Sequence, residues 1–196
     1  MIVMRCDEPH LIHGLSLPGG ERVTVRPVCP RDADVLQTYV RALSPDARYK
    51  RFFGPLRELP PAELDRVTHL DPPDQLGLIA QTRADDVIGE ARYALSPDRI
   101  ECEFALSVAE GWHGKGIGGL LLADLESRAS SLGARRLVGD VLRTNEAMQA
   151  LARKAGFRMA DVPRDARLVR IVKDLALAPA TLPRDPPTAS ALANAA

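Results

Sequence analysis

The sequence is poor in cysteine and histidine and carries no excess of either charge. Its three cysteines, Cys6, Cys29 and Cys102, are scattered and form no Cys-x-x-Cys pair, which predicts free thiols in a reducing compartment. His10 and His13 alone give little basis for a metal centre, so we expect none. With 26 basic and 26 acidic residues, the chain lacks the basic excess that is typical of nucleic-acid-binding proteins.

Long apolar runs are also missing. No run approaches the roughly 20 residues that a membrane-spanning helix requires, and no signal peptide is recognisable at the start. Together these absences predict a cytoplasmic globular protein with no nucleic-acid or membrane partner. The chain has 196 residues, 45% of them hydrophobic, which is enough for one domain with a substantial core.

Periodicity and turn residues divide the chain into three parts. We expect a loosely held leader over 1–20, one domain over 21–175, and a disordered Ala- and Pro-rich tail over 176–196. Short turns predict antiparallel pairing among the strands in the middle of the domain. The expected strands are 21–28, 76–82, 86–95, 99–108, 135–142, 157–163 and 166–175, and the expected helices begin near 30, 44, 60, 116 and 145. The expected fold is therefore α+β, with a mostly antiparallel mixed sheet of six to seven strands flanked by about four helices.

A glycine-rich segment, "GWHGKGIGGLLLADL" (111–125), leads directly into one of these helices. Glycines allow successive backbone N–H groups to turn toward one anion, and the N-terminus of the helix adds a favourable dipole. "GKGIGG" fits the dinucleotide pattern G-x-G-x-x-G, with Asp140 at the distance of a ribose-binding acid. That pattern must follow a parallel strand directly, however, whereas here an antiparallel meander and "AEGWH" precede it. The nucleoside-triphosphate loop also fails, because Lys115 is followed by glycine and not by Ser or Thr.

The stretch "SVAEGWHGKGIGGLLLADLESRA" resembles the pyrophosphate-binding motif of the GNAT superfamily of N-acetyltransferases. The resemblance extends over about 21–175 and implies the GNAT fold and acetyl-CoA as co-substrate, without a metal. It implies acetyl-CoA binding by His113, Gly114, Lys115, Gly116, Ile117 and Gly118, with Gly119 beside them. His113 replaces the usual Gln or Arg of the family motif, a small departure because the anion contacts there are mostly made by the backbone.

Two further stretches resemble the Pat-type protein lysine acetyltransferases. They are "VRPVCPRDADVLQTYVRALSPDARYKRFFG" and "VLRTNEAMQALARKAGF". The resemblance implies that the acceptor is a lysine of a partner protein, typically an acyl-CoA synthetase. A solvated basic helix face with two core phenylalanines is an equally good interpretation of "RYKRFF" when no substrate is assumed.

The strand "ECEFALSV" carries the expected catalytic residue. Alternation places Glu101 and Glu103 on one face, with Cys102 on the other, toward the expected core. By similarity to the Pat-type enzymes, Glu103 is the base that deprotonates the acceptor amine; the alternative is that the two glutamates only solvate the sheet or pair with Arg92. Because Cys102 faces the core, we expect direct attack in a ternary complex and not a covalent acetyl-cysteine.

The resemblance also implies pantetheine contacts from Leu106, Ser107 and Val108, with the Val108 N–H as a donor to the thioester oxygen. Asn145 can reach the cofactor, cap the following helix, or do both. Many relatives have a tyrosine acid immediately after the leucine that corresponds to Leu151, but here Ala152 occupies that position, and Tyr93 and Ser107 are only speculative replacements. The missing tyrosine leaves acyl-CoA sensing without turnover as a second hypothesis. Acetylation of a small amine is a further alternative to protein lysine acetylation.

Overall fold

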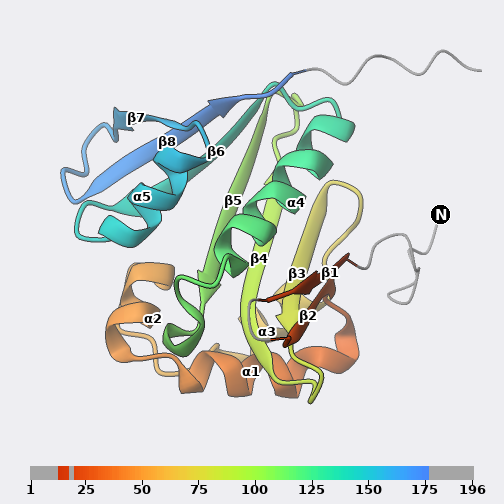
Figure 1. The fold of residues 1–196 in the computed structure, drawn as a ribbon. Helices are drawn as coiled ribbons and strands as arrows, with labels where there is room; N and C mark the ends of the chain where they lie inside the picture. Colours follow the sequence, from red (N-terminus) through yellow and green to blue (C-terminus); the bar gives the residue numbers. More distant parts are fainter. Residues whose placement is uncertain (1–12, 18–19, 177–196) are drawn as a thin grey trace, which may run out of the picture.

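The computed structural model describes residues 13–17 and 20–176 and shows one mixed sheet with helices on both faces (Figure 1). The strands lie in the order β1-β2-β3-β4-β5-β6-β8-β7, and every neighbouring pair is antiparallel except β5 and β6. The strands are β1 (His13–Ser16), β2 (Arg22–Pro27), β3 (Gln75–Gln81), β4 (Val87–Leu95), β5 (Glu101–Val108), β6 (Arg136–Leu142), β7 (Arg158–Asp161) and β8 (Leu168–Asp174). The predicted α+β class with a mostly antiparallel mixed sheet is confirmed.

The sheet also contains a short edge strand that the sequence did not indicate. β1 pairs antiparallel with β2 and lies within the predicted leader, so part of that leader belongs to the domain. Its four residues, "HGLS", show no apolar alternation from which a strand could be recognised. Apart from Ala176, the predicted tail lies outside the described residues.

The described residues form five α-helices that cover the sheet: α1 (Ala33–Ala42), α2 (Pro45–Phe52), α3 (Pro61–Thr68), α4 (Ile117–Ser131) and α5 (Glu146–Lys154). Consecutive residues of β3 define two separate layers of the core. Leu78 and Ala80 pack in the layer that contains α4, whereas Ile79 packs with α1 and α3 on the opposite face. Burial on both faces explains why β3 is a continuous apolar run.

Helix α2 has the predicted beginning but a different end. The Ser44 hydroxyl accepts a hydrogen bond from the Ala47 N–H at 3.1 Å, and Pro45 takes the first helical position. Phe53, and not the expected Gly54, adopts the left-handed conformation that ends the helix, with φ of 58°. Its side chain is 41% exposed, so "RYKRFF" does not supply two buried phenylalanines to the core.

The cysteines differ in state. Cys102 is a buried free thiol, and burial raises its pKa to about 12. Cys29 is disulfide-bonded, so the prediction of three free thiols is wrong for this residue. Within 13–17 and 20–176, the helices are too short or too polar to cross a membrane.

Candidate active site

The strands β5 and β6 are paired at one end of the sheet and separate toward the other. Their parallel register joins Glu101, Cys102 and Glu103 to Arg136, Leu137 and Val138, and it ends there. The last part of β5, including Leu106 and Val108, therefore has no ladder partner in β6. Figure 1 shows the two strands diverging toward α2 and α5.

The backbone of β5 determines which of its groups face this opening. Ser96 donates to the Glu101 carbonyl at 2.8 Å, and Ala109 donates to the Ile88 carbonyl at 2.9 Å. Since the groups that bond to one neighbour alternate along an antiparallel strand, the N–H groups of Leu106 and Val108 point away from β4, toward β6. The Val108 carbonyl accepts a hydrogen bond from His113 Nε2 at 2.8 Å, which joins the strand end to the glycine loop.

The glycine loop has the geometry of an anion site. Gly114 and Gly116 have φ of +74° and +89°, a conformation that turns backbone N–H groups to one side and that other residues adopt only at a cost. Helix α4 begins at Ile117 with no side-chain cap and no acidic residue in its first turn. The Lys115 ammonium lies 4.3 Å from the centre of the Trp112 ring, which keeps a positive charge beside the loop. An acetyl-CoA pyrophosphate fits these groups.

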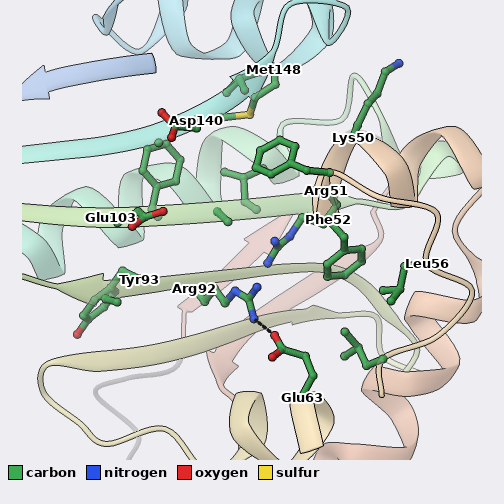
Figure 2. A pocket seen from close by; sticks show the side chains of 18 of the residues that line it. Lys50, Arg51, Phe52, Leu56, Glu63, Arg92, Tyr93, Glu103, Asp140 and Met148 are labelled. Carbon is green, nitrogen blue, oxygen red and sulfur yellow. Dashed lines mark hydrogen bonds and ion pairs between the residues drawn. The ribbon is translucent and has the colours of Figure 1, made fainter. Parts of the chain in front are cut away.

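A cavity of about 520 Å³ opens on the face of the sheet that carries Glu103 (Figure 2). Of the predicted residues, Glu103, Leu106 and Asn145 line it, whereas the glycine loop does not. The charged side chains in its wall are of both signs: Glu63, Glu103 and Asp140, with Lys50, Arg51, Arg66 and Arg92.

Glu103 is the carboxylate left available in this wall. Asp140 is held by two hydrogen bonds from Arg170, at 2.8 and 2.9 Å. Glu101 pairs with Arg136 at 3.3 Å. Arg92, the alternative partner that we considered for the glutamates of β5, contacts Glu63 instead. In the described part of the chain Glu103 is exposed and has no hydrogen bond or ion pair, although its charge interacts with that of Arg170.

A buried polar network beneath the cavity was not predicted from the sequence. Arg51 binds both carboxylate oxygens of Glu90, and the Ser107 hydroxyl donates to Glu90 at 2.9 Å. Tyr39 completes the network, with its hydroxyl 3.0 Å from that of Ser107. Burial opposes the charged form of Glu90, but Arg51 outweighs it and lowers the pKa of this carboxyl. Burial, reinforced by the charge of Glu90, raises the pKa of Tyr39 well above its usual range.

The side chain of Ser107 is therefore engaged in the network, and its backbone groups are directed toward β4, so neither is turned toward the opening for the predicted contact with pantetheine. One signal in the sequence could have suggested the network, namely the acid in the apolar strand "VIGEARYAL". Its partners were not deducible, because Arg51 lies 39 residues from Glu90 and Tyr39 lies 68 residues from Ser107.

Candidates for protonating the departing thiolate are poorly placed. Ala152 is fully buried in the core. The Tyr93 hydroxyl donates to the Pro73 carbonyl at 2.9 Å, burial raises its pKa to about 12, and Figure 2 shows it directed away from Glu103. Asn145 caps α5, accepting from the Met148 N–H at 3.2 Å, and it also borders the cavity, so both roles that we considered remain compatible with its position.

The mixed sheet, the separation of β5 from β6 and the adjacent glycine loop together define a class of protein. Comparison with known proteins identifies that class. Residues 22–158 match the family model described as the acetyltransferase (GNAT) domain. The chain belongs to the GNAT acetyltransferase family, whose members use acetyl-CoA, and it is an acyltransferase.

Individual relatives agree with this assignment. An acetyltransferase of Pseudomonas aeruginosa is 30% identical over 145 residues, which cover 72% of this chain and 78% of that protein. The GNAT domain of S. lividans PAT superposes with a TM-score of 0.78 at 29% identity, covering 86% of this chain and 99% of that one. RimL, a ribosomal L7/L12 alpha-N-protein acetyltransferase solved with coenzyme A, shares the fold at 15% identity, with a TM-score of 0.66 and coverage of 78% and 94%.

Proposed function

We propose that this protein transfers an acetyl group from acetyl-CoA to a lysine side chain of a partner protein, with an AMP-forming acyl-CoA synthetase as the partner class. The observation that carries the proposal is the unpaired carboxylate of Glu103, which faces the cavity close to where β5 and β6 separate. The substrate class is supported by the resemblance of two stretches to Pat-type enzymes and by the structural likeness to S. lividans PAT. Although Cys29 is disulfide-bonded, the rest of the composition favours a cytoplasmic protein, and we assign the reaction to the cytoplasm.

The cofactor site that we propose consists mainly of backbone groups. The loop from His113 to Gly119 holds the pyrophosphate with N–H groups and the N-terminus of α4. Leu106 and Val108 contribute main-chain groups along the opening, Ser107 lies between them with its main-chain groups toward β4, and Asn145 borders the opening from α5. Bound there, acetyl-CoA supplies an activated acetyl group.

Glu103 acts on the acceptor amine. Because the pKa of lysine is about 10.4, only about one amine in 2500 is neutral at pH 7, a handicap of roughly 4.6 kcal/mol. Glu103 removes the proton, directly or through a water, so that the amine can attack the thioester carbonyl; the C–S bond then breaks, and coenzyme A leaves as a thiolate that takes a proton from solvent. The Val108 N–H donates to the oxygen on which negative charge develops. The high pKa of Cys102 leaves its thiol protonated, which supports direct transfer to the amine.

The test is to incubate the protein with acetyl-CoA and AMP-forming acyl-CoA synthetases from the same organism, and to map acetylated lysines by mass spectrometry. Site-specific acetylation by the wild type that is lost in Glu103→Gln supports both the substrate class and the base. If acetyl-CoA binds but no protein is modified, the protein-lysine proposal is wrong.

Acetylation of a small amine is the second candidate, and the size of the cavity favours it. An acidic cavity would suit a polyamine, but four of the seven charged side chains in this wall are basic. A non-catalytic acyl-CoA sensor, the remaining hypothesis from the sequence, is not supported, because the chain belongs to an acyltransferase family. The lack of an acid at Tyr93 and Ala152 means only that neither residue protonates the leaving group.

A further inference from the structure

Three arginines and Glu63 contribute to the cavity wall, with Glu90 buried next to them, and the pairing of these charges is unequal. Arg51 binds both oxygens of Glu90. Arg66 likewise binds both oxygens of Glu63, at 2.9 and 2.6 Å. Arg92 makes one long contact, 3.3 Å from its Nη1 to Glu63 Oε1, an oxygen that Arg66 already occupies. The cluster therefore holds one positive charge more than its carboxylates neutralise.

The surplus charge belongs to a partly buried side chain that faces the cavity. The side chain of Arg92 is 25% exposed and contributes to the cavity wall. Of the five N–H donors of its guanidinium, the contact with Glu63 uses one, and this is the hydrogen bond found for it in 13–17 and 20–176. A charge withdrawn from water with so little compensation is unfavourable, and burial, followed by repulsion from Arg51, lowers the pKa of Arg92. An anion in the cavity would offset this cost.

The sheet register fixes the position of Arg92 relative to Glu103. Arg92 lies opposite Ala105, and Glu103 lies opposite Ala94, so the two charged residues are diagonal neighbours on one face of the sheet. The Cα atoms of such diagonal neighbours are about 7–8 Å apart, which is comparable to the length of a lysine side chain. Figure 2 shows the guanidinium of Arg92 directed toward Glu63, away from Glu103. The remaining carboxylate in the wall, Asp140, is occupied by Arg170, and Lys50 at the rim pairs with Asp46.

We infer that Arg92 is an acceptor-recognition residue, which binds a carboxylate of the acceptor while the amine lies at Glu103. This deepens the proposed function and rests on it for the lysine acceptor. The same carboxylate could be an acidic side chain beside the target lysine of a protein, or the α-carboxylate of a small amino acid. In either case the amine and the carboxylate must be separated by a chain, because the two protein groups are too far apart for an amine and a carboxylate on one carbon.

Paired acceptors that differ in one carboxylate test the inference. We would measure dissociation constants by calorimetry, with coenzyme A at saturation, for Nα-acetyl-lysine against its amide. A second pair consists of lysine peptides with Glu or Gln next to the lysine. The wild type is expected to prefer the carboxylate of at least one pair by roughly ten- to a hundredfold, as charge-assisted hydrogen bonds in a cavity allow. Which pair shows the preference distinguishes the small-molecule source from the protein source.

Variants of Arg92 test whether this residue causes the preference for a carboxylate. Arg92→Met is expected to abolish it, and Arg92→Lys to keep part of it, because lysine keeps the charge but loses the forked donors. Arg83→Met is the control, since Arg83 is an exposed arginine in the turn between β3 and β4. Thermal unfolding verifies that each variant is folded, and Arg92→Lys provides the test if the methionine variant is not.

Equal binding of acid and amide by the wild type in both pairs, or a preference that persists in Arg92→Met, would overturn the inference. These results are independent of the protein-lysine proposal. A carboxylate preference that depends on Arg92, found without any acetylated protein, supports the inference and contradicts that proposal. Acetylated protein with no carboxylate preference supports the protein-lysine proposal and contradicts the inference about Arg92.

Discussion

Glu101 and Glu103 lie two residues apart on the same face of β5, but their surroundings differ. Glu101 pairs with Arg136, whereas Glu103 faces the cavity. We expect Glu103→Gln to lower kcat by roughly a hundred- to ten-thousandfold, the usual loss for a general base, with the acetyl-CoA dissociation constant unchanged. Steady-state kinetics and calorimetry measure the two quantities. Glu101→Gln is the matched control, and an equal loss of kcat in both variants would contradict the assignment.

The Glu90–Arg51 pair has a consequence for stability that depends on pH. Replacement of Glu90 by Gln leaves Arg51 buried without a counter-charge, which costs about 3–5 kcal/mol for pairs of this kind. Because the folded-state pKa of Glu90 lies below its ordinary value of 4.5, the stabilisation is complete above that pH and is lost as the pH falls toward the folded-state pKa.

Denaturant unfolding of the wild type and Glu90→Gln from pH 7 down to pH 3 measures this effect. The difference in unfolding free energy is expected to shrink below about pH 4.5. A difference that stays constant over the whole range would show that the ionised form of Glu90 is not what stabilises the fold.

At the scale of residues, alternation along "ECEFALSV" correctly predicted that Cys102 faces the core and that Glu103 lies on the opposite face of the strand. Local periodicity could not predict the partner of Arg92. Glu63 lies 29 residues away in α3, and only the tertiary fold brings the two side chains together.

At the scale of elements, the beginning of α4 gives a testable prediction about backbone conformation. Gly116→Ala places a side chain on a residue with φ of +89°, which costs about 1–2 kcal/mol and disturbs the loop. We expect the affinity for acetyl-CoA to fall by roughly tenfold or more, because charge-assisted hydrogen bonds from the loop are lost.

Gly133→Ala is the matched control. Gly133 has φ of +82°, so the strain is similar, but it follows the opposite end of α4. Calorimetry with acetyl-CoA should show a loss only in Gly116→Ala, while both variants lose stability. If the two variants bind acetyl-CoA equally well, the loop is not the pyrophosphate site.

Elements with strong local signals were predictable. Ser44 and Pro45 begin α2 as expected, and Gly133 follows the end of α4. The end of α2 was not predictable from local preference, because Phe53 adopts a left-handed conformation that its own preference opposes, although Gly54 was available next to it.

For the whole molecule, the divergence of β5 from β6 places the site that we propose for acetyl-CoA between two parts of one sheet. A ligand bound there contacts both parts and stabilises only the folded state. At a concentration one hundred times its dissociation constant, acetyl-CoA should add about 2.7 kcal/mol, which corresponds to a rise in Tm of roughly 5–10 °C for a domain of this size.

Thermal unfolding with increasing acetyl-CoA measures this shift. Gly116→Ala should show a smaller rise at the same concentration, because its dissociation constant is larger. An unchanged Tm of the wild type at saturating acetyl-CoA would argue against binding across the opening.

The order of elements was predictable from turns and periodicity, since short links favour antiparallel neighbours among β3, β4 and β5. The point of divergence was not predictable from the residue pattern, because it depends on how far the parallel register of β5 and β6 extends. Helix α4, 15 residues long, connects these two neighbouring strands, and no local pattern in the sequence specifies the register.

The divided use of β5 bears on how such a protein changes over evolutionary time. In the function that we propose, the strand offers main-chain groups to acetyl-CoA and side chains, Glu103 among them, to the acceptor. Mutation replaces side chains but leaves main-chain donors in place, so long as the strand is preserved and proline is avoided. Selection can therefore remodel the acceptor cavity while the ability to bind the acyl donor is inherited unchanged, which allows one ancestral scaffold to diversify into transferases for many different amines.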